Sequence, residues 1–282
     1  MWLLFSVLTA FCWALGGVLL KPAYKKLSTS QIYTLNGISF LAFWILYKLL
    51  THAVVEIPKN IFILLPILSP LAFMTFIYAI KKGKVSIVSA VSSASIIIST
   101  TLAAIFLHEF VGPVQILLTV VMVSALVLLG LIEKKVERNG NFVGFLWGVI
   151  AAAAFGVSNT VSKYVLNNIA TISFSIINGA WMVFLSLVWL GLDRKIGVES
   201  WEALRTYEGK RGIIGSAVYS LGGFFLFLAL EKGLVSLVIP ISNLSTPLAL
   251  VFSLLLLKER VTPIQRLLIG VIFLAAVVLP LL

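Results

Sequence analysis

Long apolar runs, separated by short polar connections, occupy most of the chain, and their length indicates the element that each one forms. A helix of about twenty apolar residues crosses the roughly 30 Å hydrocarbon core of a bilayer. Barrel strands would alternate apolar and polar residues over about ten positions, a pattern that these runs lack. The sequence therefore predicts an all-α integral membrane protein with ten transmembrane helices: Trp2–Leu20, Gln31–Leu49, Ile61–Ile80, Val85–Leu107, Pro113–Ile132, Gly144–Ser162, Thr171–Gly191, Gly212–Leu230, Val235–Leu257 and Pro263–Leu282.

The ten runs form two homologous sets of five. Residues Tyr78–Gln115 and Leu228–Gln265 align without a gap at an offset of 150, with thirteen identities in thirty-eight positions. Earlier runs align at an offset of 142, in the pairs Trp13 with Phe155, Lys21 with Lys163 and Asn36 with Asn178. We expect one repeat in residues 1–139 and another in 140–282. Five crossings are an odd number, so the second repeat enters from the opposite side, and the two five-helix repeats are predicted to be inverted.

Composition and charge agree with a membrane protein and predict its orientation. Hydrophobic residues make up 61% of the chain, charged residues 11%, and the mean hydropathy is +1.13, whereas a soluble domain is nearer half apolar and a quarter charged. The net charge of +11 lies between the apolar runs and forms no aromatic-interleaved patch, so we expect no nucleic-acid binding. Of the 21 Lys and Arg residues, 17 lie in connections on one side and 4 on the other. The positive-inside rule places the basic side in the cytoplasm and both termini outside, in a multi-pass protein of the cell membrane.

Several motifs recur in the same order in both repeats. They are the Trp13…Lys21 first run, the Ala79-x-x-x-Gly83 turn, the Ser/Pro-rich fourth and ninth runs, and the Leu107-His108-Glu109 and Leu257-Lys258-Glu259 turns before Pro113 and Pro263. Together they resemble the ten-helix, EamA-type members of the drug/metabolite transporter superfamily over essentially the whole chain. The resemblance implies helices around a central cavity and export or exchange of small metabolites, such as amino acids or related compounds. Family members are usually drawn with both termini in the cytoplasm, whereas the charge distribution here favours the reverse.

Hydroxyl and amide groups on the fourth and ninth runs are candidates for the cavity wall. At 100° per residue Ser86, Ser89, Ser93 and Thr100 share one helix face, and Ser236 and Asn243 take the repeat-related azimuths of Ser86 and Ser93. Such residues line a substrate site, or else bond to the carbonyl of residue i−4 or allow close helix packing. For the combined face we favour a cavity, and Asn243 is the first residue to test.

Pro240 and Pro247 interrupt the ninth run. Each proline removes a backbone donor, which frees the carbonyl four residues earlier, near Ser236 and Asn243. A freed carbonyl either binds a ligand, as in transporters with broken helices, or is satisfied by a neighbouring helix. The sequence is compatible with both interpretations.

Charged and amide residues at equivalent points of the repeats have competing interpretations. Lys21 and Lys163 lie at run ends, where they guard the cavity mouths or snorkel to the interface. Glu109 and Glu259 lie in tight turns, where we expect each carboxylate to cap the helix that follows. Asn36 and Asn178 are expected to form hydrogen bonds across helices.

The remaining candidates complete a prediction of transport. The resemblance places Trp13 and Tyr78 at the cavity, where they would stack on a substrate, and Asn159 and Tyr219 are further candidate lining residues. No Cys/His spacing suggests a metal or cofactor site, no nucleophile elbow or metalloprotease motif suggests an enzyme, and no Asp or Glu stands in mid-run to relay protons. We expect alternating access for a small-molecule substrate in a lipid bilayer, by a monomer or homodimer. The alternatives are a flippase for a lipid-linked substrate and a non-transporting receptor or scaffold.

Overall fold

The computed structural model describes residues 1–82, 85–134, 142–193, 202–257 and 262–281, without the side chains of 85–87, 130–131, 133–134, 142 and 257. Over these residues the chain is helical and contains no strand. The elements are α1 (Trp2–Ala23), α2 (Thr29–Thr51), η1 (Ile61–Ile63), η2 (Leu65–Ile67), α3 (Leu68–Lys82), α4 (Val85–Ser92), α5 (Ser95–Phe106), α6 (Pro113–Lys134), α7 (Phe142–Leu166), α8 (Thr171–Leu192), η3 (Ala203–Arg205), α10 (Tyr207–Lys232), α11 (Val235–Ser242), α12 (Ser245–Leu257), α13 (Pro263–Val278) and η4 (Leu279–Leu281). Nine segments in these ranges are long and apolar enough to cross a membrane, and Pro113–Leu129 of α6 is a shorter apolar helix. The predicted all-α membrane fold is confirmed.

Local sequence sets the helix ends. At the start of α2, the Ser28 hydroxyl accepts a hydrogen bond from the Gln31 N–H at 3.2 Å, and the Ser28 N–H donates to Gln31 Oε1 at 2.9 Å. Thr262 and Gln265 form the same capping box at the start of α13. These reciprocal bonds satisfy amides that have no partner inside the helix. At the other end of α2, His52 adopts a φ of 52° and ends the helix in a left-handed turn.

The fourth and ninth spans are each broken into two half-helices. The sequence predicted that prolines interrupt the ninth span, but it indicated no break in the fourth. Residues 93–94 separate α4 from α5, and the repeat-related residues 243–244 separate α11 from α12. Pro247 has no N–H for the Asn243 carbonyl, which accepts instead from the Thr246 N–H at 3.1 Å. The fourth span breaks without proline. There the Ser89 carbonyl accepts both the Ser93 hydroxyl at 2.9 Å and the Ser93 N–H at 3.1 Å, and the next N–H, that of Ala94, donates three residues back to the Val91 carbonyl at 3.0 Å.

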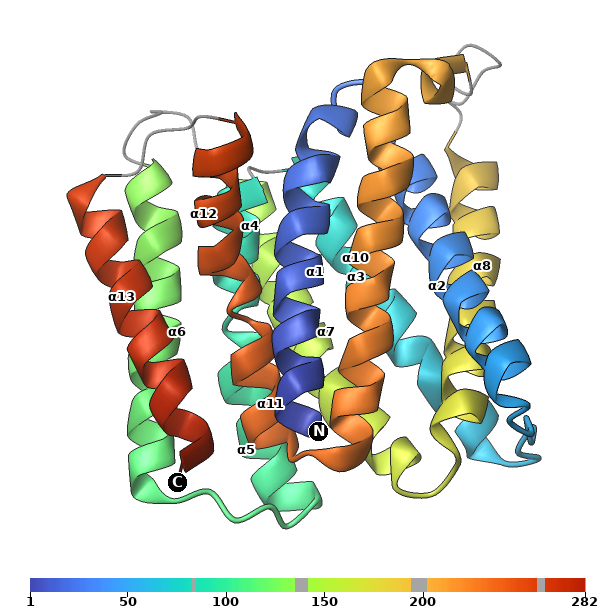
Figure 1. The fold of residues 1–282 in the computed structure, drawn as a ribbon, viewed down its shortest axis with the longest axis horizontal. Coiled ribbons are helices and arrows are strands. Elements are labelled where there is room, and N and C mark those ends of the chain that lie inside the picture. The colour runs from blue at the N-terminus through green and yellow to red at the C-terminus, as the bar shows by residue number, and fades with distance from the viewer. Residues whose placement is uncertain (83–84, 135–141, 194–201, 258–261, 282) are drawn as a thin grey trace.

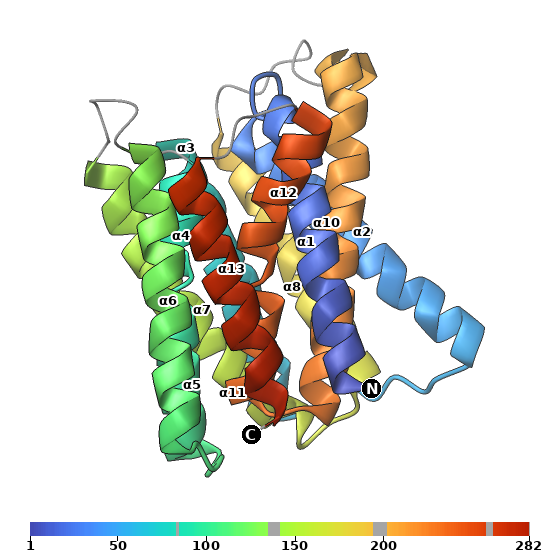
Figure 2. The same ribbon diagram turned by 60° about the vertical axis from the view of Figure 1, so that its left-hand side comes forward.

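The two repeats run in opposite directions, as predicted. In Figures 1 and 2, α1 starts at the face that carries both termini, whereas α7 starts at the opposite face and runs back towards it. A Cβ atom built on Gly37 would lie 3.5 Å from the Val183 nitrogen, and one built on Gly179 would lie 3.3 Å from the Leu41 Cα. Gly37 and Leu41 occupy the same positions in the first repeat as Gly179 and Val183 in the second; such equivalent residues are here called repeat mates. The contact between α2 and α8 is therefore reciprocal, as at a two-fold interface.

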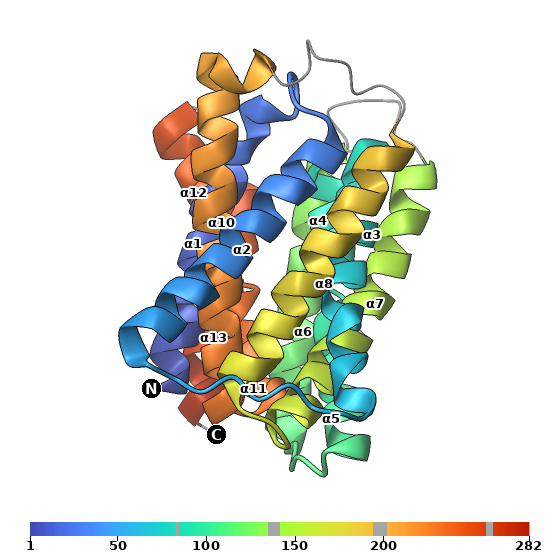
Figure 3. The ribbon, with the colours of Figure 1, turned by 90° about the vertical axis from the view of Figure 1, so that its right-hand side faces the viewer.

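The other helices are arranged around this pseudo-two-fold relation. Helix α1 packs on α10, and the mate of that pair is α7 on α3. Helices α2 and α8 lie at one end of the bundle, while α6 and α13 lie together at the other (Figures 1 and 3). This arrangement leaves α1, α3, α7 and α10 in the middle of the bundle. The predicted boundary at 139/140 lies outside the described residues.

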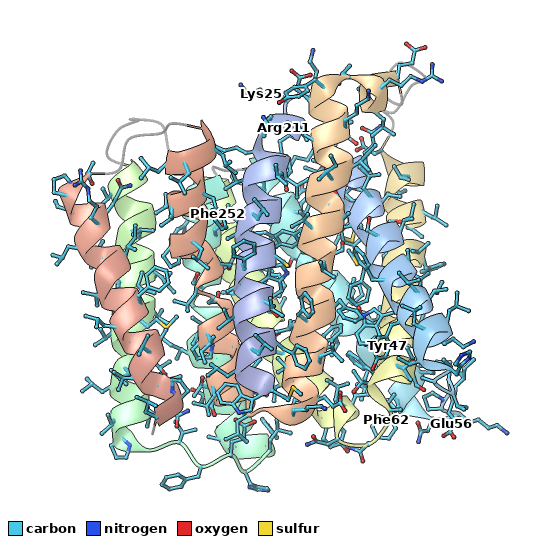
Figure 4. The ribbon with its side chains drawn as sticks, viewed as in Figure 1. Lys25, Tyr47, Glu56, Phe62, Arg211 and Phe252 are labelled. Atoms are coloured by element: carbon cyan, nitrogen blue, oxygen red, sulfur yellow. The ribbon has the colours of Figure 1, made fainter. Side chains whose placement is uncertain are left out.

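Basic residues from two predicted connections share one face of the bundle. Lys25, between α1 and α2, and Arg211, near the start of α10, lie close together at the face opposite the termini (Figure 4). Their common position agrees with the assignment of the 1–2 and 7–8 connections to one side. Which side of the membrane this face meets is still a prediction.

A candidate solute site at mid depth

A continuous series of ring contacts crosses the middle of the bundle. Trp13 of α1 stacks on Tyr219 of α10 with 6.0 Å between ring centroids, and Tyr219 stacks on Phe73 of α3 at 5.6 Å. Phe73 contacts Phe76 at 6.4 Å, and Phe76 contacts Phe155 of α7 at 5.8 Å. These five residues, here called the aromatic bridge, connect Trp13 to its repeat mate Phe155.

The bridge has the location and the exposure expected of a site wall. Trp13, Tyr219 and Phe155 stand near the midpoints of their helices, and all five rings are only partly buried although they lie among the central helices. Tyr33 of α2 adds a further ring, 5.6 Å from Phe73. Aromatic faces bind apolar, flat or cationic groups, so this region suits a small organic molecule.

Of the predicted aromatic candidates, two meet and one stands apart. Trp13 and Tyr219 are stacked in the bridge, whereas Tyr78 packs edge-on against Trp147 at 4.7 Å and lies 5.6 Å from Lys82 Nζ. Sequence reasoning did not single out Phe73, Phe76 or Phe155. The repeat held a signal for one of them, because Phe155 is the mate of Trp13.

The hydroxyl and amide candidates divide into two groups. Ser93 donates to the Ser89 carbonyl and Asn243 Nδ2 donates to the Ile239 carbonyl at 2.9 Å, both four residues back along the same span. By contrast, the buried hydroxyls of Thr100 and Ser236 have no hydrogen-bond partner among the described residues. The repeat-related hydroxyls of Ser92 and Ser242, at the ends of α4 and α11, share that property. Asn159 is half-buried in α7, and the side chain of Ser86 is not described.

The amide pair behaves as predicted. Asn36 Nδ2 donates to Ser216 Oγ on α10 at 3.2 Å, and the Ser220 hydroxyl donates to the Asn36 carbonyl at 2.9 Å. Asn178 Nδ2 donates to the Pro66 carbonyl at 2.9 Å. Pro66 and Ser216 occupy equivalent positions in the two repeats. Each amide therefore bonds its own helix to the equivalent element of the other repeat. Each such bond contributes about 1 kcal/mol in a membrane.

The prediction for Glu109 is corrected in one respect. Its carboxylate does cap a helix, but that helix is α11 of the other repeat and not the α6 that follows: Oε1 accepts from the Val235 N–H at 2.8 Å and Oε2 from the Ser236 N–H at 3.0 Å. His108 turns the chain with a φ of 53°, and α6 begins with Pro113, which has no N–H to offer. Glu259, its repeat mate, lies outside the described residues.

Lys163 and the Ser236 carbonyl each have a hydrogen-bond partner in the structure. Lys163 Nζ donates to the Leu230 carbonyl at 2.7 Å and to the Glu231 carbonyl at 3.3 Å, at the end of α10. Pro240 leaves the Ser236 carbonyl without a helical donor, and Gln115 Nε2 reaches it from α6 at 3.3 Å. A neighbouring helix therefore provides the donor for that carbonyl. This agrees with the interpretation that another helix, and not a ligand, satisfies the carbonyl freed by Pro240. Lys21 lies exposed at the end of α1.

Comparisons with known proteins agree with this arrangement. The sequence model of the EamA-like transporter family matches residues 1–131 and again residues 142–280. An uncharacterized protein of Methanocaldococcus jannaschii is 25% identical over 132 residues, which are 47% of this chain and 92% of that protein. A solved crystal structure superimposes with a TM-score of 0.80 and 14% sequence identity, over 99% of this chain and 96% of the other. At that identity the likeness shows the fold alone.

The doubled match and the fold together define a multi-pass membrane transporter of the drug/metabolite transporter type. The chain belongs to the EamA-like transporter family. Its relative from M. jannaschii matches over nearly its whole length, and that length is about half of this chain. A single repeat is therefore close in size to that entire protein.

Proposed function

We propose that this protein carries a small organic solute across the membrane by alternating access, in export or exchange, with the solute bound beside the aromatic bridge. The observation that supports the proposal is the series of partly buried rings from Trp13 to Phe155, because its two ends are equivalent residues of the two repeats. The repeats are inverted, so a rocking motion of one against the other would present the same site to each face in turn.

The chemistry of the bridge favours an uncharged or cationic solute with an apolar or flat portion. Ring faces attract cations and stack on flat groups. The mid-span sequence supplies no Lys or Arg to pair with an anion, which an anionic solute would need at that depth. The unpartnered hydroxyls of Thr100 and Ser242 are the polar groups that we propose for orienting the solute.

We further propose that the face carrying the termini is extracytoplasmic. The support is the excess of basic residues in the connections of the opposite side, 17 against 4, and the location of Lys25 and Arg211 on one face. Positively charged connections are retained in the cytoplasm during insertion.

Purified protein in liposomes tests the transport proposal. Pools of labelled uncharged, cationic and anionic solutes are offered, and we expect counterflow of members of the first two pools. Trp13→Ala removes one end of the bridge and should raise the half-saturating concentration about 2- to 10-fold, from roughly 0.5–1.5 kcal/mol per aromatic contact. Phe184→Ala, which truncates an exposed ring on α8, is the matched control and should have no effect.

Three outcomes would contradict the proposal. Counterflow of anions alone would reject the proposed solute class. Movement of lipid-linked substrates alone would favour a flippase. The absence of any flux from protein whose folding is verified by gel filtration and circular dichroism would favour a receptor or scaffold.

A further inference from the structure

The turn between α10 and α11 is held by polar side chains from three other segments. Glu109, in the loop after α5, is buried, and its carboxylate accepts the first two backbone amides of α11, those of Val235 and Ser236. A carboxylate at a helix N-terminus satisfies free donors and the positive end of the helix dipole. Because the donors belong to the second repeat, the bond connects the two repeats at the face that carries the termini.

Lys163 and Gln115 complete this cluster. Lys163 donates to the last carbonyls of α10, and the carboxylates of Glu109 and Glu231 both attract its ammonium. Gln115 of α6 donates to the Ser236 carbonyl. The end of α10 and the start of α11 are thus fastened to α7, to α6 and to the loop after α5. Glu109, Gln115 and Lys163 are here called the terminal-face latch.

The repeat places the same residue types at the equivalent positions of the opposite face. Gln265 is the mate of Gln115 and Lys21 is the mate of Lys163, and Glu259, at the position of Glu109, is also identical in type. In the structure the two glutamines are used differently. Gln265 Oε1 accepts from the Thr262 N–H at 2.8 Å within its own capping box, whereas Gln115 reaches across to α11. Gly112, at the position of Thr262, has no hydroxyl to form such a box.

Helix packing has the same asymmetry. At the terminal face α11 packs on α5 and contacts α7. In the described part of the chain, the mate of the first pair, α12 with α4, is not among the closely packed helices. If the protein works by alternating access, rocking of the inverted repeats would exchange such unequal contacts between the two faces.

We propose that the terminal-face latch closes one end of the transport pathway, and that Lys21 and Gln265 make the equivalent contacts with the α3–α4 turn when the other end closes. In that second arrangement Lys21 donates to the Ile80 and Lys81 carbonyls and Gln265 to the Ser86 carbonyl, the mates of the acceptors seen here. The latch is engaged at one face at a time. This inference rests on the proposed alternating access, and it assigns the residues that bias the equilibrium between its two states.

Spin-label distances at both faces test the inference. In a Cys12→Ala background, one pair of labels is placed at Phe106 and Lys232 on the terminal face, and another at the repeat-related Leu256 and Lys82. All four positions are exposed. Double electron–electron resonance in nanodiscs without solute reports both populations. We expect Glu109→Gln to lengthen the first distance, shorten the second, and change the population ratio about tenfold, which corresponds to ~1.4 kcal/mol.

Matched variants separate the latch from general effects of charge or folding. Glu56→Gln removes an exposed carboxylate on the same face of the bundle (Figure 4) that accepts no bond from α11, and it should leave both distances unchanged. Gln115→Met should act in the same direction as Glu109→Gln and provides a second test if that variant does not fold.

Failure of the latch can be told apart from failure of the transport proposal. If Glu109→Gln and Gln115→Met leave both distances unchanged, or if Glu56→Gln has the same effect as Glu109→Gln, the latch assignment is overturned, whether or not liposomes take up solute. If the two distances respond in opposite directions but no solute moves, the latch stands and the transport assignment fails.

Discussion

A close backbone approach between α1 and α10 predicts opposite effects for substitutions at two neighbouring glycines. A Cβ atom at Gly16 would lie 2.6 Å from the Tyr219 backbone nitrogen and 2.8 Å from the Tyr219 Cα and Cβ. Backbone atoms cannot rotate away, so the two helices must separate by about 1 Å to reach a normal contact of roughly 3.5 Å. Overpacking of this kind costs about 1–3 kcal/mol. Gly17, the next residue, has no heavy atom within 4 Å of its added Cβ.

Gly16→Ala and Gly17→Ala are therefore expected to shift stability in opposite directions. Gly17→Ala should stabilise the protein by about 0.5–1 kcal/mol, because alanine restricts the unfolded chain more than glycine does and fits a helix interior. Gly16→Ala should destabilise it, and by moving Tyr219 it should also raise the half-saturating solute concentration. Unfolding in mixed micelles of increasing dodecyl sulfate content, followed by far-ultraviolet circular dichroism, measures both variants.

Two results would refute this reasoning. If Gly16→Ala unfolds at the wild-type detergent fraction or above, the close contact between α1 and α10 is not present in the folded protein. If both substitutions destabilise equally, the effect belongs to the helix itself and not to its packing against Tyr219.

Three further predictions concern other parts of the molecule. Asn36→Leu removes the amide that donates to Ser216 Oγ, whereas Ser220 keeps its bond to the backbone carbonyl of residue 36. The substitution should lower the free energy of unfolding by about 1 kcal/mol, measured in the same detergent titration. Asn243→Ala removes the amide that donates to the Ile239 carbonyl at the break between α11 and α12. It should weaken solute uptake by roughly fivefold, as expected for the loss of one hydrogen bond of ~1 kcal/mol; an unchanged uptake curve would remove Asn243 from the candidate site. A reporter enzyme that works only in the cytoplasm, fused after Leu282, should be inactive in cells, and activity there would reverse the proposed orientation.

The sequence predicted the architecture because the repeat and the run lengths are strong physical signals. Twenty apolar residues have few alternatives to a membrane-spanning helix, and five spans per repeat require inversion. The break in the fourth span carried no comparable signal. A hydroxyl-rich segment such as Ser92 to Ser95 is compatible with a continuous helix, and only its packing distinguishes the two conformations.

The site was predicted less completely, since its contacts join residues that are far apart in sequence. A carboxylate before a helix is expected to cap that helix, but Glu109 caps a helix more than a hundred positions later. Phe73 and Phe76 belong to the bridge because of the helices that face them, and no local pattern marks them out. Gln115 was visible as an identity between the repeats, and Pro240 marked the Ser236 carbonyl as free, but only the fold brings the two groups together.

Helices α2 with α8, and α6 with α13, are each paired with their own repeat mate, at the two ends of the bundle. Exchange of the two repeats maps each of these contacts onto itself, as the reciprocal approach of Gly37 and Gly179 shows. A contact that this exchange maps onto itself is the same in both states, so the change of state does not require it to break. The two outer pairs can therefore serve as stationary pivots, so that covalent cross-links within either pair would leave turnover intact.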